Sequence, residues 1–168
     1  CEGLPLTLRI RVTRVDGAGC TPVETAHVDV WQCDALGVYS DVRDTNGFFD
    51  TRGQKFLRGY QRTDGAGHAE FLTVYPGWYT GRAVHIHFKV RLFAGGRRSY
   101  EFTSQLYFDD AVTDQVHALA PYASKGPRDR RNNRDGIFRA GGSGERLLHL
   151  ARGQGGYAGA IAVGLRMG

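Results

Sequence analysis

The chain of 168 residues contains three cysteines, five prolines and one methionine, and no run of about 18 apolar residues. None of the cysteines has the C-x-x-C spacing of a zinc ribbon or a redox motif. No low-complexity segment and no internal repeat interrupts the sequence. These absences exclude a membrane-spanning helix, a zinc ribbon, a repeat array and a disordered linker as the basis of function.

The cysteines leave two interpretations open. Cys20 lies in a predicted turn and Cys33 ends a predicted strand, so a hairpin can bring them together as a disulfide. A disulfide would indicate an oxidising compartment and an extracellular location. The alternative is a pair of buried free thiols in a cytoplasmic protein.

The positive charge of the chain is modest and dispersed. The formal net charge is +5, from 22 Lys and Arg against 17 Asp and Glu. Basic residues cluster only at Arg128–Arg134, where Asp and Asn interrupt the run. Since nucleic-acid binding requires a basic face, we interpret this run as a solvated loop and predict no nucleic-acid partner.

Glycine is abundant, with 24 residues, twice the usual share of roughly 7 per cent. Glycine-rich turns between short alternating segments are typical of strands joined by tight turns. Segments of this kind predict strands at 4–15, 27–33, 69–74, 84–93, 99–108, 136–140, 146–151 and 157–165.

One helix is predicted at 109–119, where apolar residues recur at helical spacing after a capping aspartate. Two long loops, 41–54 and 122–135, separate the predicted elements. Long loops in compact domains tend to be functional. The fold class is therefore mostly all-β: an antiparallel β-sandwich with one short helix and long active-site loops, forming a single domain over 1–168.

The stretch Tyr75–Val90 contains a His-Ile-His triplet in an alternating strand. Since side chains of a strand point to opposite faces with period 2, His85 and His87 share one face and apolar residues occupy the other. Two imidazoles on one strand face can converge on one ion. The alternative is a solvated polar face on an edge strand.

Two tyrosines extend this pair into a possible metal site. Tyr79 precedes His85 by six residues, and the intervening turn can fold its phenol back over the strand. Tyr39 follows Gly37 at the exit of another strand. Phenolate is a hard anionic oxygen donor that suits Fe(III), whereas zinc more usually recruits thiolate, imidazole or carboxylate.

Several longer motifs resemble, in the same order, those of the intradiol ring-cleavage dioxygenases, the family of catechol 1,2-dioxygenase and protocatechuate 3,4-dioxygenase. The motifs that carry the resemblance are VDVWQCDALGVYS (28–40), FLRGYQRTDGAGHAEFLTVYPGWY (56–79), GRAVHIHFKV (81–90), TSQLYFDD (103–110) and, more loosely, PYASKGPRDRRNNRDGIFRAGGSG (121–144). Together they cover nearly the whole chain.

The resemblance implies roles for individual residues. The positions that match the family's iron ligands are Tyr39, Tyr79, His85 and His87. The matching catalytic residues are Arg82, Gln105 and Tyr79, the last as a displaceable ligand that takes up a substrate proton. For substrate binding we predict Gly37, Val38, Trp78, Arg82 and Gln105, with simple packing as the alternative for Trp78.

The implied function is non-haem Fe(III)-dependent intradiol cleavage of catechols by O₂, giving cis,cis-muconate-type dicarboxylates. Catechol-type members carry an N-terminal helical segment used in dimerisation, whereas here the first predicted strand begins at Leu4. The oligomeric state therefore stays open, and we expect a shallow pocket that accepts several substituted catechols. Two alternatives are a β-sandwich binding module with incidental histidines and a zinc hydrolase using His85 and His87.

Overall fold

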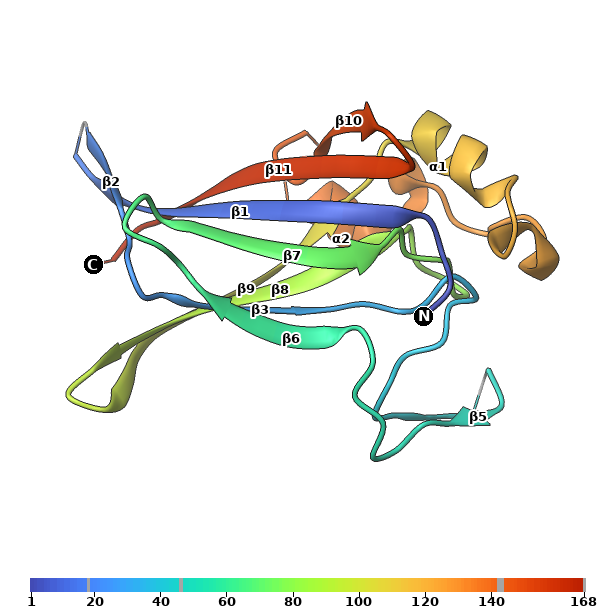
Figure 1. Cartoon of the computed structure of the whole chain (residues 1–168), viewed down its shortest axis with the longest axis horizontal. Helices are drawn as coiled ribbons and strands as arrows, with labels where there is room; N and C mark the ends of the chain where they lie inside the picture. The colour runs from blue at the N-terminus through green and yellow to red at the C-terminus, as the bar shows by residue number, and fades with distance from the viewer. Residues whose placement is uncertain (18, 46, 142–143, 168) are drawn as a thin grey trace.

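The computed structural model describes residues 1–17, 19–45, 47–141 and 144–167. Two β-sheets pack face to face as a sandwich, with the helix α1 (Asp110–His117) at one end (Figure 1). Sheet A comprises β1 (Pro5–Asp16), β2 (Gly19–Pro22), β7 (His68–Val74), β10 (His149–Gly153) and β11 (Gly156–Leu165). Sheet B comprises β3 (His27–Trp31), β6 (Arg58–Arg62), β8 (His85–Ala94) and β9 (Arg97–Tyr107). The predicted mostly-β sandwich is confirmed.

The remaining elements are short and lie in the connections. They are β4 (Arg43–Asp44), β5 (Phe49–Asp50), α1 (Asp110–His117), η1 (Tyr122–Lys125), η2 (Asn132–Arg134) and α2 (Gly136–Ala140). The predicted helix is α1, and its cap is Asp109, whose side chain accepts hydrogen bonds from two backbone N–H groups of the first turn. No helix in the described part of the chain has the length and apolarity to cross a membrane.

Three local predictions need correction. Residues Gly136–Ala140 form the helix α2 rather than a strand, because the Asp135 side chain caps their N–H groups. Strand β6 was not predicted, since Arg58–Arg62 has no apolar alternation and is largely exposed. Among the described strands, β1 and β11 pair in parallel rather than antiparallel, with Leu6 opposite Tyr157.

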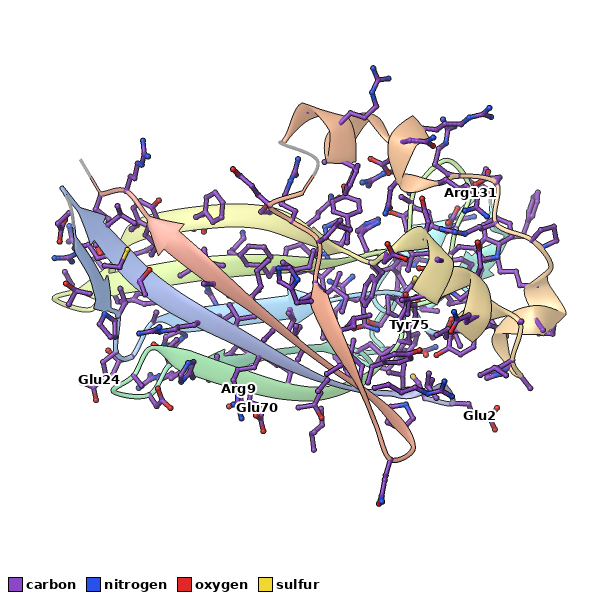
Figure 2. The ribbon with its side chains drawn as sticks, turned by 90° about the horizontal axis from the view of Figure 1, so that it is seen from above. Glu2, Arg9, Glu24, Glu70, Tyr75 and Arg131 are labelled. Carbon is purple, nitrogen blue, oxygen red and sulfur yellow. The ribbon has the colours of Figure 1, made fainter. Side chains whose placement is uncertain are left out.

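The core lies between the sheets and is built from the alternating faces of the strands. On β8, Ile86, Phe88 and Val90 are buried against the inner face of sheet A. The outer face of sheet A carries charged pairs such as Arg9 with Glu70 (Figure 2). His85 and His87 therefore lie on the outer face of sheet B, where loops rather than a second sheet cover them.

The predicted Cys20–Cys33 disulfide is wrong, since both cysteines are free. Cys20 is exposed on β2, before β3 begins, whereas Cys33 is buried beyond the other end of β3. Burial raises the pKa of the Cys33 thiol to about 12. The predicted extracellular location was inferred from this disulfide. Without the disulfide, the location stays an untested prediction.

Candidate active site

The candidate site lies at the start of β8, where two histidines and a tyrosine meet. The His85 Nε2 atom lies 3.1 Å from Nε2 of His87 and 3.2 Å from the Tyr79 hydroxyl. The His85 Nδ1 atom lies 2.7 Å from the Ala83 carbonyl oxygen. Because a carbonyl oxygen only accepts, Nδ1 carries the proton and Nε2 presents its lone pair to the site.

Tyr39 completes the group from a different part of the chain. Its ring centroid lies 5.5 Å from that of Tyr79 and 6.0 Å from that of His87. Two hydrogen bonds hold the preceding turn, since an Asp34 carboxylate oxygen accepts from the N–H groups of Leu36 and Val38 at 2.9 Å. The structure therefore brings together all four residues that the resemblance matched to iron ligands.

The electrostatics of this group favour neutral side chains in the absence of a cation. Burial lowers the pKa of His85 to about 4, and burial with the neighbouring His85 lowers that of His87 to about 3. Burial also raises the pKa of the phenols of Tyr39 and Tyr79 above the ordinary value. Near neutral pH both imidazoles are thus uncharged, each with one ring nitrogen free of a proton, as metal coordination requires.

The donor set fits a hard, highly charged cation. The Tyr39 hydroxyl is buried beside the Tyr79 phenol but forms no hydrogen bond of good geometry among the described residues, and an unsatisfied buried polar group is costly. Ferric iron, which prefers anionic oxygen with imidazole nitrogen, would supply the missing partner. Within the described ranges, no group of three or more His, Cys, Asp or Glu side chains is placed to hold a metal. The zinc hydrolase alternative therefore has no third ligand of those types there.

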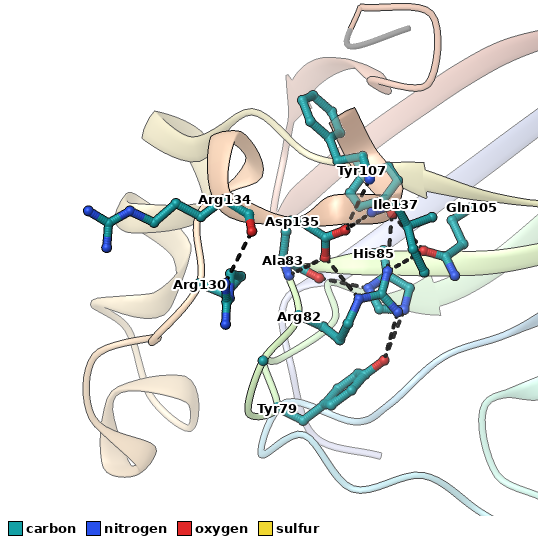
Figure 3. A network of polar contacts seen from close by, with 12 residues as sticks. Tyr79, Arg82, Ala83, His85, Gln105, Tyr107, Arg130, Arg134, Asp135 and Ile137 are labelled. Carbon is teal, nitrogen blue, oxygen red and sulfur yellow. Dashed lines mark hydrogen bonds and ion pairs between the residues drawn. The ribbon is translucent and has the colours of Figure 1, made fainter. Parts of the chain in front are cut away.

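Arg82 and Gln105 lie in a polar network beside Tyr79 and His85 (Figure 3). The Arg82 guanidinium donates through Nη2 to Gln105 Oε1 at 2.6 Å and to the Tyr107 hydroxyl at 3.2 Å. Its Nη1 lies 3.5 Å from the Tyr79 hydroxyl, and its Nε donates to Asp135 Oδ2 at 2.9 Å. Gln105 in turn lies beside the histidine pair, as β8 and β9 pair at that position.

Three residues of this region were missed by sequence reasoning: Trp31, Tyr107 and Asp135. The Trp31 indole stacks on the His87 imidazole with centroids 4.9 Å apart and an interplanar angle of 3°. Strand pairing places Trp31 opposite His87. The alternation of β3 predicts which face of the strand Trp31 occupies. That Trp31 contacts His87 follows only from the register between β3 and β8.

The remaining predicted residues, Gly37, Val38 and Trp78, form a packed corner near Tyr39. Gly37 has φ of 82°, and a Cβ there would lie 2.0 Å from the Trp78 carbonyl oxygen, so the turn requires glycine. The Trp78 indole donates to the Gly126 carbonyl oxygen, and the Lys125 ammonium lies 4.9 Å from its ring centroid. These contacts favour packing as the role of Trp78.

Comparison with known proteins identifies the family. The Dioxygenase family profile (Dioxygenase_C) matches residues 2–125, more than half of the chain. No curated protein sequence matches the chain significantly. The chain belongs to this dioxygenase family, and its structural neighbours identify it more closely as a member of the intradiol ring-cleavage dioxygenases, which are oxidoreductases. The predicted resemblance is confirmed.

Solved structures extend the match over the whole fold. An intradiol ring-cleavage dioxygenase from Tetranychus urticae is similar with a TM-score of 0.83 and 26% identity, over 98% of this chain and 82% of that chain. The dioxygenase domain of a Streptomyces dioxygenase–carbohydrate-binding fusion gives a TM-score of 0.65 and 26% identity, over 99% and 82%. A 3-chlorocatechol 1,2-dioxygenase from Rhodococcus opacus, at 22% identity and TM-score 0.57, over 98% and 61%, shares the fold.

Proposed function

We propose that this protein is a non-haem Fe(III)-dependent dioxygenase that cleaves catechols between the two hydroxyl-bearing carbons. The observation that supports this most is the convergence of the Tyr79 hydroxyl with the two imidazole Nε2 atoms beside the buried hydroxyl of Tyr39, which forms no hydrogen bond of good geometry among the described residues. In this proposal the ligands are Tyr39, Tyr79, His85 and His87. Ferric iron bound there would supply a Lewis acid that lowers the pKa of both catechol hydroxyls, and the doubly deprotonated ring would be electron-rich enough to react with O₂.

The proton chemistry of substrate binding falls to Tyr79. The Tyr79 hydroxyl lies 3.2 Å from His85 Nε2, and burial raises the pKa of this phenol, so Tyr79 would take up a proton readily whenever it did not serve as a ligand. A catechol hydroxyl is the proton source within the site. Tyr79 is therefore the group that accepts a substrate proton as the catechol binds.

Arg82 and Gln105 would act on the substrate ring. Arg82 offers a fixed positive charge beside Tyr79, where negative charge develops on the ring during its reaction with O₂. The Gln105 Oε1 atom already accepts from Arg82 and from the Tyr107 hydroxyl at 2.6 Å. Its amide nitrogen lies 3.5 Å from Nδ1 of His87, whose Nε2 faces the site.

The substrate class that we propose is a range of substituted catechols. Beside Trp31 a groove of about 310 Å³ opens on the outer face of sheet B, lined mostly by charged side chains of β3, β6, β8 and β9. Trp31 lines this groove and stacks on His87, so its indole separates the groove from the proposed metal ligands, none of which lines the groove. In this proposal a ring substituent would reach the groove past Trp31 without entering the core.

A panel of catechols tests the proposal. Iron-loaded protein should consume O₂ with catechol, 4-methylcatechol, protocatechuate and a phenylpropanoid catechol at kcat/KM values within about tenfold, a barrier difference of ~1.4 kcal/mol. Each product should be a muconate-type dicarboxylate carrying both atoms of isotopically labelled O₂. Turnover of a single catechol would contradict the broad specificity, and products other than the dicarboxylate would contradict intradiol cleavage.

A further inference from the structure

Arg82 is held from two sides by side chains of which two, Asp135 and Tyr107, are buried and one, Gln105, is half-buried. Asp135 binds its Nε atom, while Gln105 and Tyr107 bind Nη2 (Figure 3). The Asp135 side chain is 1% exposed, against 21% for Arg82. Because contacts at both Nε and Nη2 fix the plane of a guanidinium, Nη1 is left directed at the Tyr79 hydroxyl.

Asp135 divides its two oxygens between separate tasks. Its Oδ1 accepts from the N–H groups of Ile137 at 2.9 Å and Phe138 at 3.0 Å, which caps α2. Its Oδ2 accepts from Arg82 Nε and from the Ala83 N–H, both at 2.9 Å. Although burial opposes ionisation, the hydrogen bonds from Arg82, Phe138 and Ala83 hold the pKa of Asp135 below its ordinary value.

The Oδ2 contacts also fix the backbone that leads into the histidine pair. Ala83 donates its N–H to Asp135 and, through its carbonyl oxygen, accepts from His85 Nδ1 at 2.7 Å. One carboxylate thus touches the arginine and the residue that orients the first histidine. A simple helix cap would need only Oδ1.

We propose, on the basis of the function proposed above, that Asp135 is a positioning residue: it orients Arg82 towards the substrate ring through Oδ2. Asp135 acts through Arg82, and its burial keeps it from touching substrate. The competing interpretation is that Asp135 serves the fold alone, as the cap of α2.

Asp135→Asn separates these interpretations. The single amide oxygen of Asn can still cap α2, but its NH₂ group then faces two donors, Arg82 Nε and the Ala83 N–H. Asp135→Ser provides a second variant, because serine is a good N-cap and offers no carboxylate to Arg82. Asp109→Asn is the matched control, since Asp109 caps α1 through Ala111 and Val112 and forms no ion pair with an arginine in the described residues.

We expect both Asp135 variants to lower kcat about 10- to 100-fold, with KM changed by less than about threefold and iron content unchanged, whereas Asp109→Asn leaves kcat unchanged. A kcat within threefold of the parent would overturn the proposal. Failure of both variants to fold would assign Asp135 to the fold and overturn it as well.

A double-mutant cycle with Arg82→Lys tests the coupling directly. In the Arg82→Lys background, Asp135→Asn should lower kcat by less than about threefold, because the guanidinium that Asp135 orients is already absent. Urea unfolding of the iron-free proteins should show the same non-additivity, independently of any activity. Effects that multiply for kcat, together with changes that add for the free energy of unfolding, would overturn the proposal. An iron-loaded parent without ring-cleaving activity would instead contradict the proposed function.

Discussion

Tyr39→Phe is expected to abolish ring cleavage while leaving the iron-free fold intact. Loss of a proposed ligand should lower kcat/KM by more than the roughly 10- to 100-fold typical of removing a residue that supports a metal ligand. The Tyr39 hydroxyl forms no hydrogen bond of good geometry among the described residues. Its removal should therefore change the free energy of unfolding by less than about 1 kcal/mol, or raise it.

Metal analysis, O₂ uptake and urea unfolding of the same preparations measure these effects. Tyr60→Phe is the matched control, because Tyr60 is 57% exposed on β6 and stacks on His27, away from the proposed ligands. The control should keep its iron, colour and activity. A Tyr39→Phe protein with unchanged colour and activity would contradict the assignment of Tyr39 as a ligand.

Arg82→Met is expected to produce the second large effect, a fall in kcat of about 10²- to 10³-fold with iron retained. The variant removes a fixed positive charge from the position beside Tyr79 and Gln105. Arg82→Lys keeps a charge but loses the planar fork that binds Asp135 and Gln105 together, so its kcat should lie between those of the parent and Arg82→Met.

Steady-state O₂ uptake over a range of catechol concentrations separates kcat from KM for these variants. Arg9→Met is the control, since Arg9 forms an exposed ion pair with Glu70 on the outer face of sheet A (Figure 2). An exposed pair of this kind contributes ~0–1 kcal/mol to stability, and the control should leave kcat unchanged. A rise in KM alone for Arg82→Met would assign Arg82 to binding and contradict its role in the chemical step.

The sheets were predictable where one face of a strand is buried. The alternation of Leu4–Val15 and of Val84–Val90 places apolar residues inside, as the structure has them. Strand β6 and helix α2 were not predictable on this basis. The first is an exposed strand that pairs with β3 through its backbone, and the second is five residues long and depends on the Asp135 cap.

The site was predictable in part, for a similar reason. Alternation alone puts His85 and His87 on one face. Tyr39 was a candidate only from its place at the exit of a strand, and the resemblance gave it its role, because a loop residue carries no periodic signal. Asp135 lies 53 residues from its partner Arg82. A single aspartate before a short segment predicted neither the helix cap nor the distant arginine.

The visible absorption spectrum of the purified protein, with and without catechol, tests the central claim most directly. Iron held by the phenolates of Tyr39 and Tyr79 should give a burgundy protein with a broad tyrosinate-to-Fe(III) band. The band should change when catechol is added, as the substrate chelates iron, and it should bleach on chelation or reduction of the iron. A colourless protein after iron loading, or a band that catechol leaves unchanged, would contradict the account.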